Sequence, residues 1–237
     1  LGSMGGFYTY AQLLDILDSM ALEFPGLISF KQAVDTTLTI EGRPVYYVKI
    51  SDNPTVDETE PEVLYTAIHH AREPESMSQL IYYMWYLLEN YAADSTVRNL
   101  VDNTEMYFVP CINPDGYIYN ETTDPAGGGM WRKNRRDNLD GEYGVDINRN
   151  YGWQWGLDDI GSSPLTGDGT YRGTSGFSEP ETQAIRNFTN RHEFKLALNY
   201  HTYGNFHIVP WGYGTNFFTP DSLQFDFYSE ALTKYNH

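Results

Sequence analysis

The sequence predicts an α/β fold in which helices cover both faces of a mixed β-sheet. Three observations indicate it. Segments with helical periodicity alternate along the chain with short apolar segments typical of strands. Two of these, EVLYTAI at 62–68 and FKLALNYH at 194–201, are apolar runs of the kind that a sheet buries on both faces. The 237 residues suffice for one large domain, and no repeat or linker divides them.

The first half of the chain begins with a helix and a hairpin. Apolar side chains at helical spacing predict a helix over 9–23, which ends before Pro25. The segments LISFKQAV (27–34) and VYYVKIS (45–51) are predicted strands, joined as a hairpin through EGRP. The apolar strand at 62–68 follows, and then come helices near 74–92 and 94–103.

The second half contains the longest segment without clear periodicity. After the predicted strand EMYFVPCI (105–112), residues 113–178 are dominated by Gly, Asp, Asn and aromatic residues. A loop region of this length in a compact domain usually carries function. The segment 178–192 is a predicted helix with Ser178 as its cap. The apolar strand at 194–201 and a last helix near 221–235 complete the chain.

Charge and composition narrow the range of partners. There are 15 basic and 32 acidic residues, which gives a net charge of −17. A polyanion is therefore not expected as a partner, and we predict no nucleic-acid binding. No apolar run is long enough to span a bilayer, so we expect no membrane partner. The single cysteine, Cys111, excludes an internal disulfide and a cysteine-based zinc site.

Two histidines fall at the carboxyl ends of predicted strands. His70 follows the strand at 62–68, and His201 ends the strand at 194–201. Because ligands collect at the carboxyl ends of strands in such sheets, these histidines are expected at one edge of the sheet. Glu73 lies three residues after His70. Two histidines, one glutamate and an open fourth position form a catalytic zinc pattern.

The residues alone leave the choice between His69 and His70 open. Pro74 disfavours helical geometry at Glu73 and suits the first turn of the next helix, so 69–73 is predicted to be a turn. Strand alternation gives Ile68 and His70 the same side, which favours His70 over His69. A surface turn with a chance His-x-x-Glu pair is the alternative.

Six motifs occur in an order that resembles a known family. They are HHARE (69–73), NPDGY (113–117), MWRKNRR (130–136), GVDINRNY (144–151), YRGTSGFSEPET (171–182) and YHTYGNFHIVPWGYG (200–214). Segment by segment they resemble the zinc metallocarboxypeptidases of the carboxypeptidase A type, with the closest likeness to bacterial carboxypeptidase T. The likeness covers residues 7–237, and residues 1–6 are expected to be a tag or a processed terminus.

The resemblance implies a zinc site, a substrate class and residue roles. It implies a mostly parallel twisted sheet and a secreted or periplasmic exopeptidase that acts on peptides with a free C-terminal carboxylate. The implied zinc ligands are His70, Glu73 and His201. Arg135 would hold the developing oxyanion of the scissile carbonyl, a role that suits a fixed cation. Asn148 and Arg149 would bind the C-terminal carboxylate, and Arg72 and Tyr203 would lie along the peptide-binding cleft.

A run of carboxylates at 51–62, SDNPTVDETEPE, has two interpretations. One is a solvated acidic loop. The other is a structural calcium site, since calcium takes several oxygen ligands. The likeness to carboxypeptidase T implies Asp57, Glu58, Glu62 and Glu105 as candidate calcium ligands.

The chain also departs from the family pattern. The family's general-base glutamate lies in a later strand, and no residue in 202–237 matches it. We therefore expect a catalytic domain that is incomplete at its C-terminal end and lacks the last strand and helix. Three hypotheses remain: a zinc exopeptidase, a zinc-retaining peptide- or carboxylate-binding domain without the base, and a related zinc acyl-hydrolase. A missing strand would leave an open sheet edge, so self-association is also expected.

Overall fold

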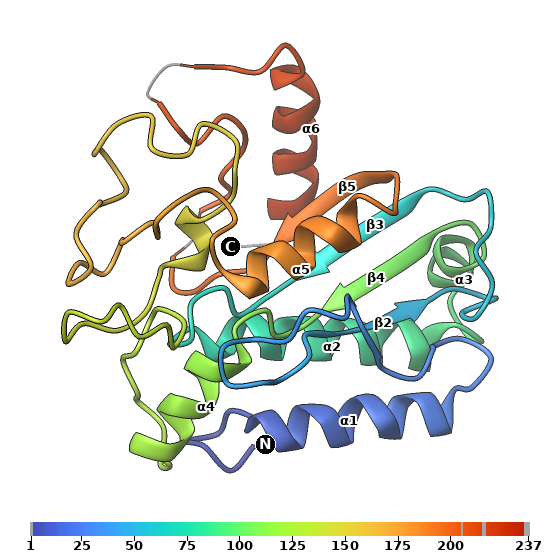
Figure 1. Ribbon diagram of the computed structural model, residues 1–237. Helices are drawn as coiled ribbons and strands as arrows, with labels where there is room; N and C mark the ends of the chain where they lie inside the picture. Colours follow the sequence, from blue (N-terminus) through green and yellow to red (C-terminus); the bar gives the residue numbers. More distant parts are fainter. Residues whose placement is uncertain (1, 205, 215–216, 235–237) are drawn as a thin grey trace. The chain divides into compact units, whose positions relative to one another are not determined.

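A five-stranded mixed sheet organises the chain (Figure 1). The computed structural model describes residues 2–204, 206–214 and 217–234, and the chain divides into two units at residues 202 and 203. The strands lie in the order β1-β2-β4-β3-β5. Strand β3 pairs in parallel with β4 and β5, whereas β1–β2 and β2–β4 are antiparallel. Their bounds are Gln32–Ala33 (β1), Tyr46–Ile50 (β2), Glu62–Thr66 (β3), Glu105–Val109 (β4) and Phe194–Asn199 (β5). The predicted α/β class with a mixed sheet is confirmed.

Three helices pack on one face of the sheet and share its larger core. They are α1 (Tyr10–Glu23), α2 (Pro74–Asn90) and α3 (Ser95–Val101). Helix α1 begins at a capping box, in which Thr9 and Gln12 each bind the other's backbone amide. Its buried stripe includes Leu13 and Leu17, which join α2 side chains and the strand residues Tyr65 and Phe108 in one cluster.

Helix α5 (Pro180–Thr189) covers the opposite face (Figure 1). Its buried residues Ile185 and Phe188 cluster with Leu64, Tyr107 and Val109 of β3 and β4. Neighbouring residues of one strand, such as Leu64 and Tyr65, thus enter different cores. This explains why the middle residues of these strands are apolar on both sides rather than alternating.

The predicted hairpin at 27–51 forms only in part. Its first strand reduces to the two-residue β1 and an isolated bridge between Ile28 and Ile50. The hydroxyl of Ser29 accepts the backbone N–H of Lys49 at 2.9 Å, so a side chain takes the place of a ladder bond. The connection at 34–45 is a wide loop, which Asp115 holds by bonds to Thr39 and to the Glu41 amide.

Helix α4 (Pro114–Thr123) was not predicted, because it lies in the region expected to consist of loops. Its buried residues include Pro114, Asp115, Gly116 and Tyr117. Polar and small residues on the buried side give no apolar periodicity, so the usual signal of a helix is missing. The Asn113 cap and Pro114 at the first position are the signals that could have identified it.

The second unit spans 203–237 and contains α6 (Ser222–Thr233), which confirms the predicted last helix. None of its helical residues is buried. In the part of the chain that the structure describes, no helix combines the length and the apolar character needed to cross a bilayer.

Candidate metal centre and active site

A sharp turn follows β3 and carries the first candidate ligands. The strand ends at Thr66, and Ile68 adopts a φ of 52°, which is rare for a β-branched residue. Residues 69–73 form a turn, and Pro74 begins α2, as predicted. The left-handed Ile68 interrupts strand alternation, so alternation does not distinguish His70 from His69 in this structure.

His70, Glu73 and His201 converge at the carboxyl edge of the sheet. Nδ1 of His70 lies 2.7 Å from Oε1 of Glu73, and Nδ1 of His201 lies 2.8 Å from Oε2 of the same carboxylate. The two Nδ1 atoms are 3.2 Å apart. Two imidazole nitrogens and a carboxylate directed at one point are a donor set that fits zinc.

The electrostatics of this group favour an ionised glutamate. Burial opposes the charge of Glu73, but bonds from His201 and His70 outweigh burial and lower its pKa to about 2. Burial would also lower the pKa of His70, yet its bonds to Asp146 and Glu73 raise it. Because a metal ligand must be deprotonated and the pKa of His70 is raised, metal binding here should weaken as the pH falls.

His69 faces away from this convergence. Its Nε2 lies 2.9 Å from the hydroxyl of Tyr151, and its Nδ1 is buried without a partner among the described residues. Burial, followed by the neighbouring His201 and His70, lowers the pKa of His69 to about 3. The side chain is therefore neutral, and it packs beside the candidate ligands rather than among them.

Asp146, which was not among the predicted site residues, lies between His70 of the ligand group and Arg132. Its Oδ1 lies 3.3 Å from Nε2 of His70. Its Oδ2 accepts bonds from Arg132, at 2.6 Å from Nη2 and 3.1 Å from Nε. A carboxylate on the far nitrogen of a metal-binding histidine is a common feature of metal sites. Its place two residues before Asn148 in DINRN was the available signal.

The structure does not bring Arg135 to this group. Its guanidinium lies over the rings of Tyr119 (3.8 Å) and Trp131 (4.6 Å), and its Nε is 4.0 Å from Glu41. Arg132, three residues earlier in the same motif, instead contacts Asp146. The arginine next to the candidate metal centre is thus Arg132, and this placement differs from the sequence-based expectation.

Backbone and side-chain bonds tie the ligand turn to the arginine segment. The amide of Ala71 donates to the carbonyl of Arg132 at 3.0 Å. Nδ2 of Asn113 donates to the carbonyls of His69 (3.2 Å) and Lys133 (3.1 Å). A Cβ at Gly116 would lie 2.5 Å from the Lys133 carbonyl, so only glycine permits this approach.

Of the remaining predicted substrate residues, Asn148 lies beside a candidate ligand, Arg149 is bonded to backbone carbonyls, and Tyr203 belongs to the second unit. Nδ2 of Asn148 lies 3.5 Å from Nε2 of His201. The Arg149 side chain donates to the carbonyls of Gly161 (2.6 Å) and Asn148 (3.1 Å). Tyr203 begins the second unit and is described only within that unit.

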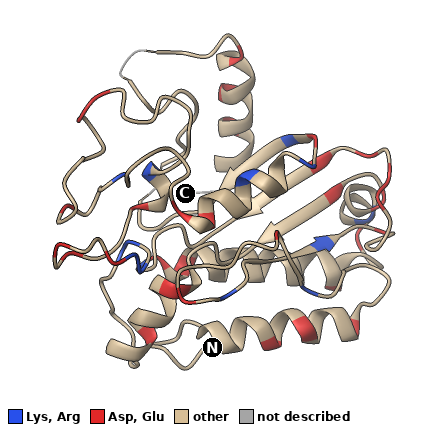
Figure 2. Ribbon diagram, viewed as in Figure 1, with Lys and Arg blue, Asp and Glu red and all other residues tan. Residues whose placement is uncertain are grey.

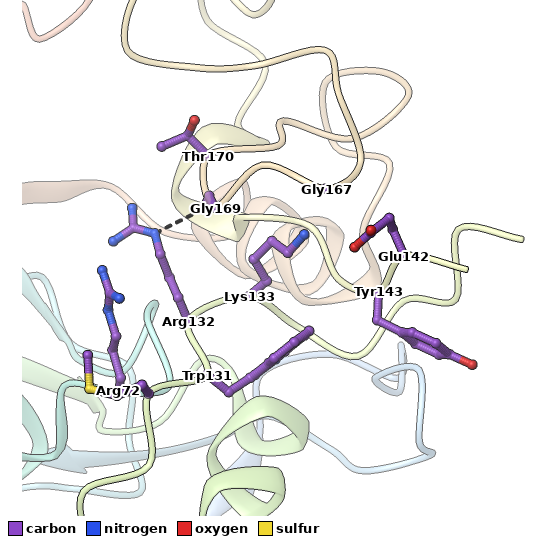
Figure 3. A pocket seen from close by; sticks show the side chains of 10 residues that line it. Arg72, Trp131, Arg132, Lys133, Glu142, Tyr143, Gly167, Gly169 and Thr170 are labelled. Atoms are coloured by element: carbon purple, nitrogen blue, oxygen red, sulfur yellow. Dashed lines mark hydrogen bonds between the residues drawn. The ribbon is translucent and has the colours of Figure 1, made fainter. Parts of the chain in front are cut away.

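Arg72 and Arg132 line a cavity of about 460 Å³ (Figure 3). Their guanidinium groups lie side by side at one end, and Glu142 and Tyr143 lie at the other. Arg72 is exposed and has no ion pair or hydrogen bond among the described residues. Figure 2 shows that acidic residues are spread over the elements. The sequence places four basic residues within 132–136. The cavity therefore offers a free cation in an otherwise acidic protein.

The family comparison agrees with this geometry. A family model described as zinc carboxypeptidase matches residues 13–236. The chain belongs to the zinc carboxypeptidase family. The predicted resemblance is thereby confirmed at family level, and the particular likeness to carboxypeptidase T stays a prediction.

Individual members of the zinc carboxypeptidase family show how much of the protein this chain represents. A zinc carboxypeptidase of Saccharothrix mutabilis subsp. capreolus is 32% identical over 217 residues, which cover 89% of this chain and 48% of the relative. Carboxypeptidase O of Bos taurus is 37% identical over 182 residues, which cover 76% and 46%. The chain spans about half the length of these relatives.

A solved family member shares the fold. The carboxypeptidase A of Helicoverpa armigera superposes with a TM-score of 0.77 at 29% identity, over 94% of this chain and 52% of that one.

Carboxylates of the acidic loop and Glu105 of β4 form two groups. Asp57, Glu62 and Glu105 form one, and Asp52, Glu58 and Glu60 form the other. Glu105 is fully buried and already accepts a bond from Lys49 at 2.6 Å. Three of the four candidate calcium ligands thus share a group, and Glu58 belongs to the second.

Proposed function

We propose that this chain carries the metal centre of a zinc-dependent exopeptidase that hydrolyses the C-terminal peptide bond of peptides. The observation that supports this most is the convergence of His70, Glu73 and His201 within 4.8 Å of one another in a zinc carboxypeptidase family member. These three residues would hold the zinc ion. When bound, zinc acts as a Lewis acid on the carbonyl and lowers the pKa of water.

Asp146 has a positioning role in this proposal. Its carboxylate lies 3.3 Å from Nε2 of His70 and would favour the tautomer with the proton on Nε2, which leaves the lone pair of Nδ1 facing Glu73 and His201. The same carboxylate binds the Arg132 guanidinium. One side chain would therefore set both the tautomer of a ligand and the direction of a catalytic cation.

Arg132, in place of Arg135, would stabilise the oxyanion. A cation acts on developing charge only if it is fixed next to the reacting carbonyl. Arg132 is held through Asp146 next to His70, whereas Arg135 is engaged by aromatic rings and lies near Glu41.

Substrate binding would use the two sides of the ligand group. Asn148, beside His201, would bind the C-terminal carboxylate together with Arg149 after that arginine leaves its carbonyl partners. Arg72, with its free guanidinium, would contact the substrate upstream of the scissile bond, and by the family likeness Tyr203 is a further candidate substrate residue. By the same family likeness we expect a secreted or periplasmic protein.

The alternative is a zinc-retaining domain that binds peptides or carboxylates without cleaving them. Among the described residues, Glu73 is itself a proposed ligand, and Asp146, which lies against His70, is engaged by Arg132. Neither is free to accept a proton from water. Hydrolysis would therefore need a further base.

Release of free amino acids from peptides tests the proposal. Full-length protein should cleave peptides with a free C-terminus and leave C-terminally amidated copies intact. Addition of a chelator should abolish the cleavage. Zinc binding without cleavage of either peptide would support the binding domain instead. Activity on N-acyl amino acids but not on peptides would support an acyl-hydrolase.

Zinc content tests the ligand assignment directly. His70→Ala should abolish stoichiometric zinc, measured by plasma emission after dialysis, because it removes one of three donors. His69→Ala is the matched control and should retain zinc. The reverse result would refute the assignment.

We also propose that the acidic loop binds calcium. The convergence of Asp57 and Glu62 near Glu105, with Glu58 in the neighbouring group, supports it. Added calcium should then raise the melting temperature of the protein, and Asp57→Asn should reduce that increase. An equal increase in both proteins would contradict the site.

A further inference from the structure

Two buried glutamates at the start of α5, one at its N-cap and one in its first turn, contact the arginine segment, which comprises residues 130–136. Glu179 and Glu181 are 2% and 0% exposed. Nδ2 of Asn134 donates to both, at 2.8 Å to Oε2 of Glu179 and 3.2 Å to Oε2 of Glu181. One amide nitrogen thus holds two carboxyl groups close together.

The two carboxyl groups differ in their other partners. Glu179 also accepts bonds from Arg136 Nε (3.0 Å) and from the hydroxyl of Ser178 (2.8 Å). Oε1 of Glu181 is buried and has no hydrogen-bond partner among the described residues. Glu179 is therefore equipped to carry a charge, and Glu181 is not.

The groups that face Glu181 disfavour a second negative charge. They are Glu179 at the N-cap of its helix, Asp115 of α4 and the phenol of Tyr151, while Arg136 is paired with Glu179. Burial, with Glu179 and Asp115 adding to it, raises the pKa of Glu181 to about 8 against the opposing hydrogen bonds. Two adjacent carboxyl groups in such different surroundings take different protonation states.

Asn134 connects this pair to the candidate active site. Its side-chain Oδ1 accepts a hydrogen bond from the backbone N–H of Val145 at 2.8 Å. The backbone N–H of Asn134 donates to the carbonyl of Val145 at 3.0 Å. Arg132 lies two residues before Asn134, and Asp146 directly follows Val145. The side chains of Arg132 and Asp146 bind each other at 2.6 Å. The position of Asn134 therefore fixes how the arginine segment meets the Asp146 segment.

We propose that Glu181, in its protonated form, is a positioning residue that holds Asn134 and, through it, the Arg132–Asp146 pair. The proposal rests on the function proposed above. Loss of the proton would create an uncompensated charge next to Glu179. Either Asn134 shifts or water enters, and in both cases Arg132 loses its alignment with the ligand group.

The glutamine variant separates protonation from packing. Glu181→Gln keeps the shape and neutrality of the protonated acid at every pH, and Glu89→Gln, at an exposed site on α2, is the matched control. With zinc-loaded full-length protein, we compare kcat and KM from about pH 6 to about pH 10. At about pH 9, kcat of the wild type and of the control should fall about tenfold relative to the glutamine variant, with little change in KM.

Infrared spectra show the proton itself. A carboxylic-acid carbonyl band should be present near neutral pH in the wild type, vanish as the pH rises past 8, and be missing in Glu181→Gln. Without that band the proposal fails. A band that is present while the kcat profiles of wild type and glutamine variant coincide would show a purely structural role and also overturn it.

Zinc affinity keeps the inference separate from the proposed function. If no peptide is cleaved, the exopeptidase proposal fails, but Asp146 should still orient His70. The zinc affinity of the wild type should then drop above about pH 8 relative to the glutamine variant, by about tenfold. Coinciding affinity curves would overturn the positioning role.

Discussion

At the scale of single residues, two arginines three positions apart in one motif lie in different surroundings. Arg132 binds the Asp146 carboxylate next to His70, while Arg135 stacks on Tyr119 and Trp131. Both belong to the run MWRKNRR, and sequence spacing gives no reason to prefer one of them. Only the fold of the loop decides which guanidinium reaches the ligand group.

This difference predicts opposite consequences for two alanine variants. Arg132→Ala should lower kcat by about a hundredfold or more, since a fixed cation would be lost from the oxyanion position. Arg135→Ala should leave kcat near the wild-type value and reduce stability by about 1 kcal/mol through the lost ring contacts. Steady-state kinetics and urea unfolding measure both. If Arg135→Ala lowered kcat more than Arg132→Ala does, Arg135 would be the residue that stabilises the oxyanion.

The three candidate metal ligands could be predicted from the sequence, whereas the polar residues that contact them or their neighbours could not. His70, Glu73 and His201 could be proposed because strand ends and ordered motifs mark them. Asp146 and Asn134 act through contacts between loops far apart in the chain, and no period or spacing marks such contacts. The roles of buried polar residues in a long loop region therefore depend on the structure.

At the scale of elements, the start of α4 joins three segments of the candidate site. Asn113 caps the helix by accepting the Gly116 amide at 3.0 Å. Its Nδ2 also binds the carbonyls of His69 and Lys133. The helix was missed from the sequence because it is held by this polar cap and by small buried residues rather than by an apolar stripe.

Replacing that cap should weaken the protein and its metal centre together. Asn113→Ala removes a helix cap and leaves two buried carbonyls without their donor, so we expect a loss of about 3 kcal/mol in the free energy of unfolding. Chemical unfolding followed by tryptophan fluorescence measures it. Asn103→Ala, at an exposed turn after α3, is the matched control and should change stability by less than about 0.5 kcal/mol. Equal losses in both variants would contradict the role of α4.

At the scale of the whole molecule, the faces of the sheet are covered by helices, but its edge at β5 has no pairing strand among the described residues. Helices cover both faces, and β3 and β4 have a neighbouring strand on each side. Strand β5 pairs with β3 alone among the residues that the structure describes. Its residues alternate between partly buried and exposed, whereas those of β4 are all buried. A free edge beside a buried strand is a surface that other strands can join.

We therefore expect the 237-residue chain to self-associate through β5. Light scattering after size exclusion should show a mass that rises with protein concentration, because edge pairing is an intermolecular equilibrium. Ala197→Lys places a charge at the exposed middle of β5 and should shift the population towards monomer. Ala93→Lys, in the exposed turn after α2, carries the same charge elsewhere and should associate like the wild type. A wild-type chain that stays monomeric at every concentration would show that this edge is covered in solution.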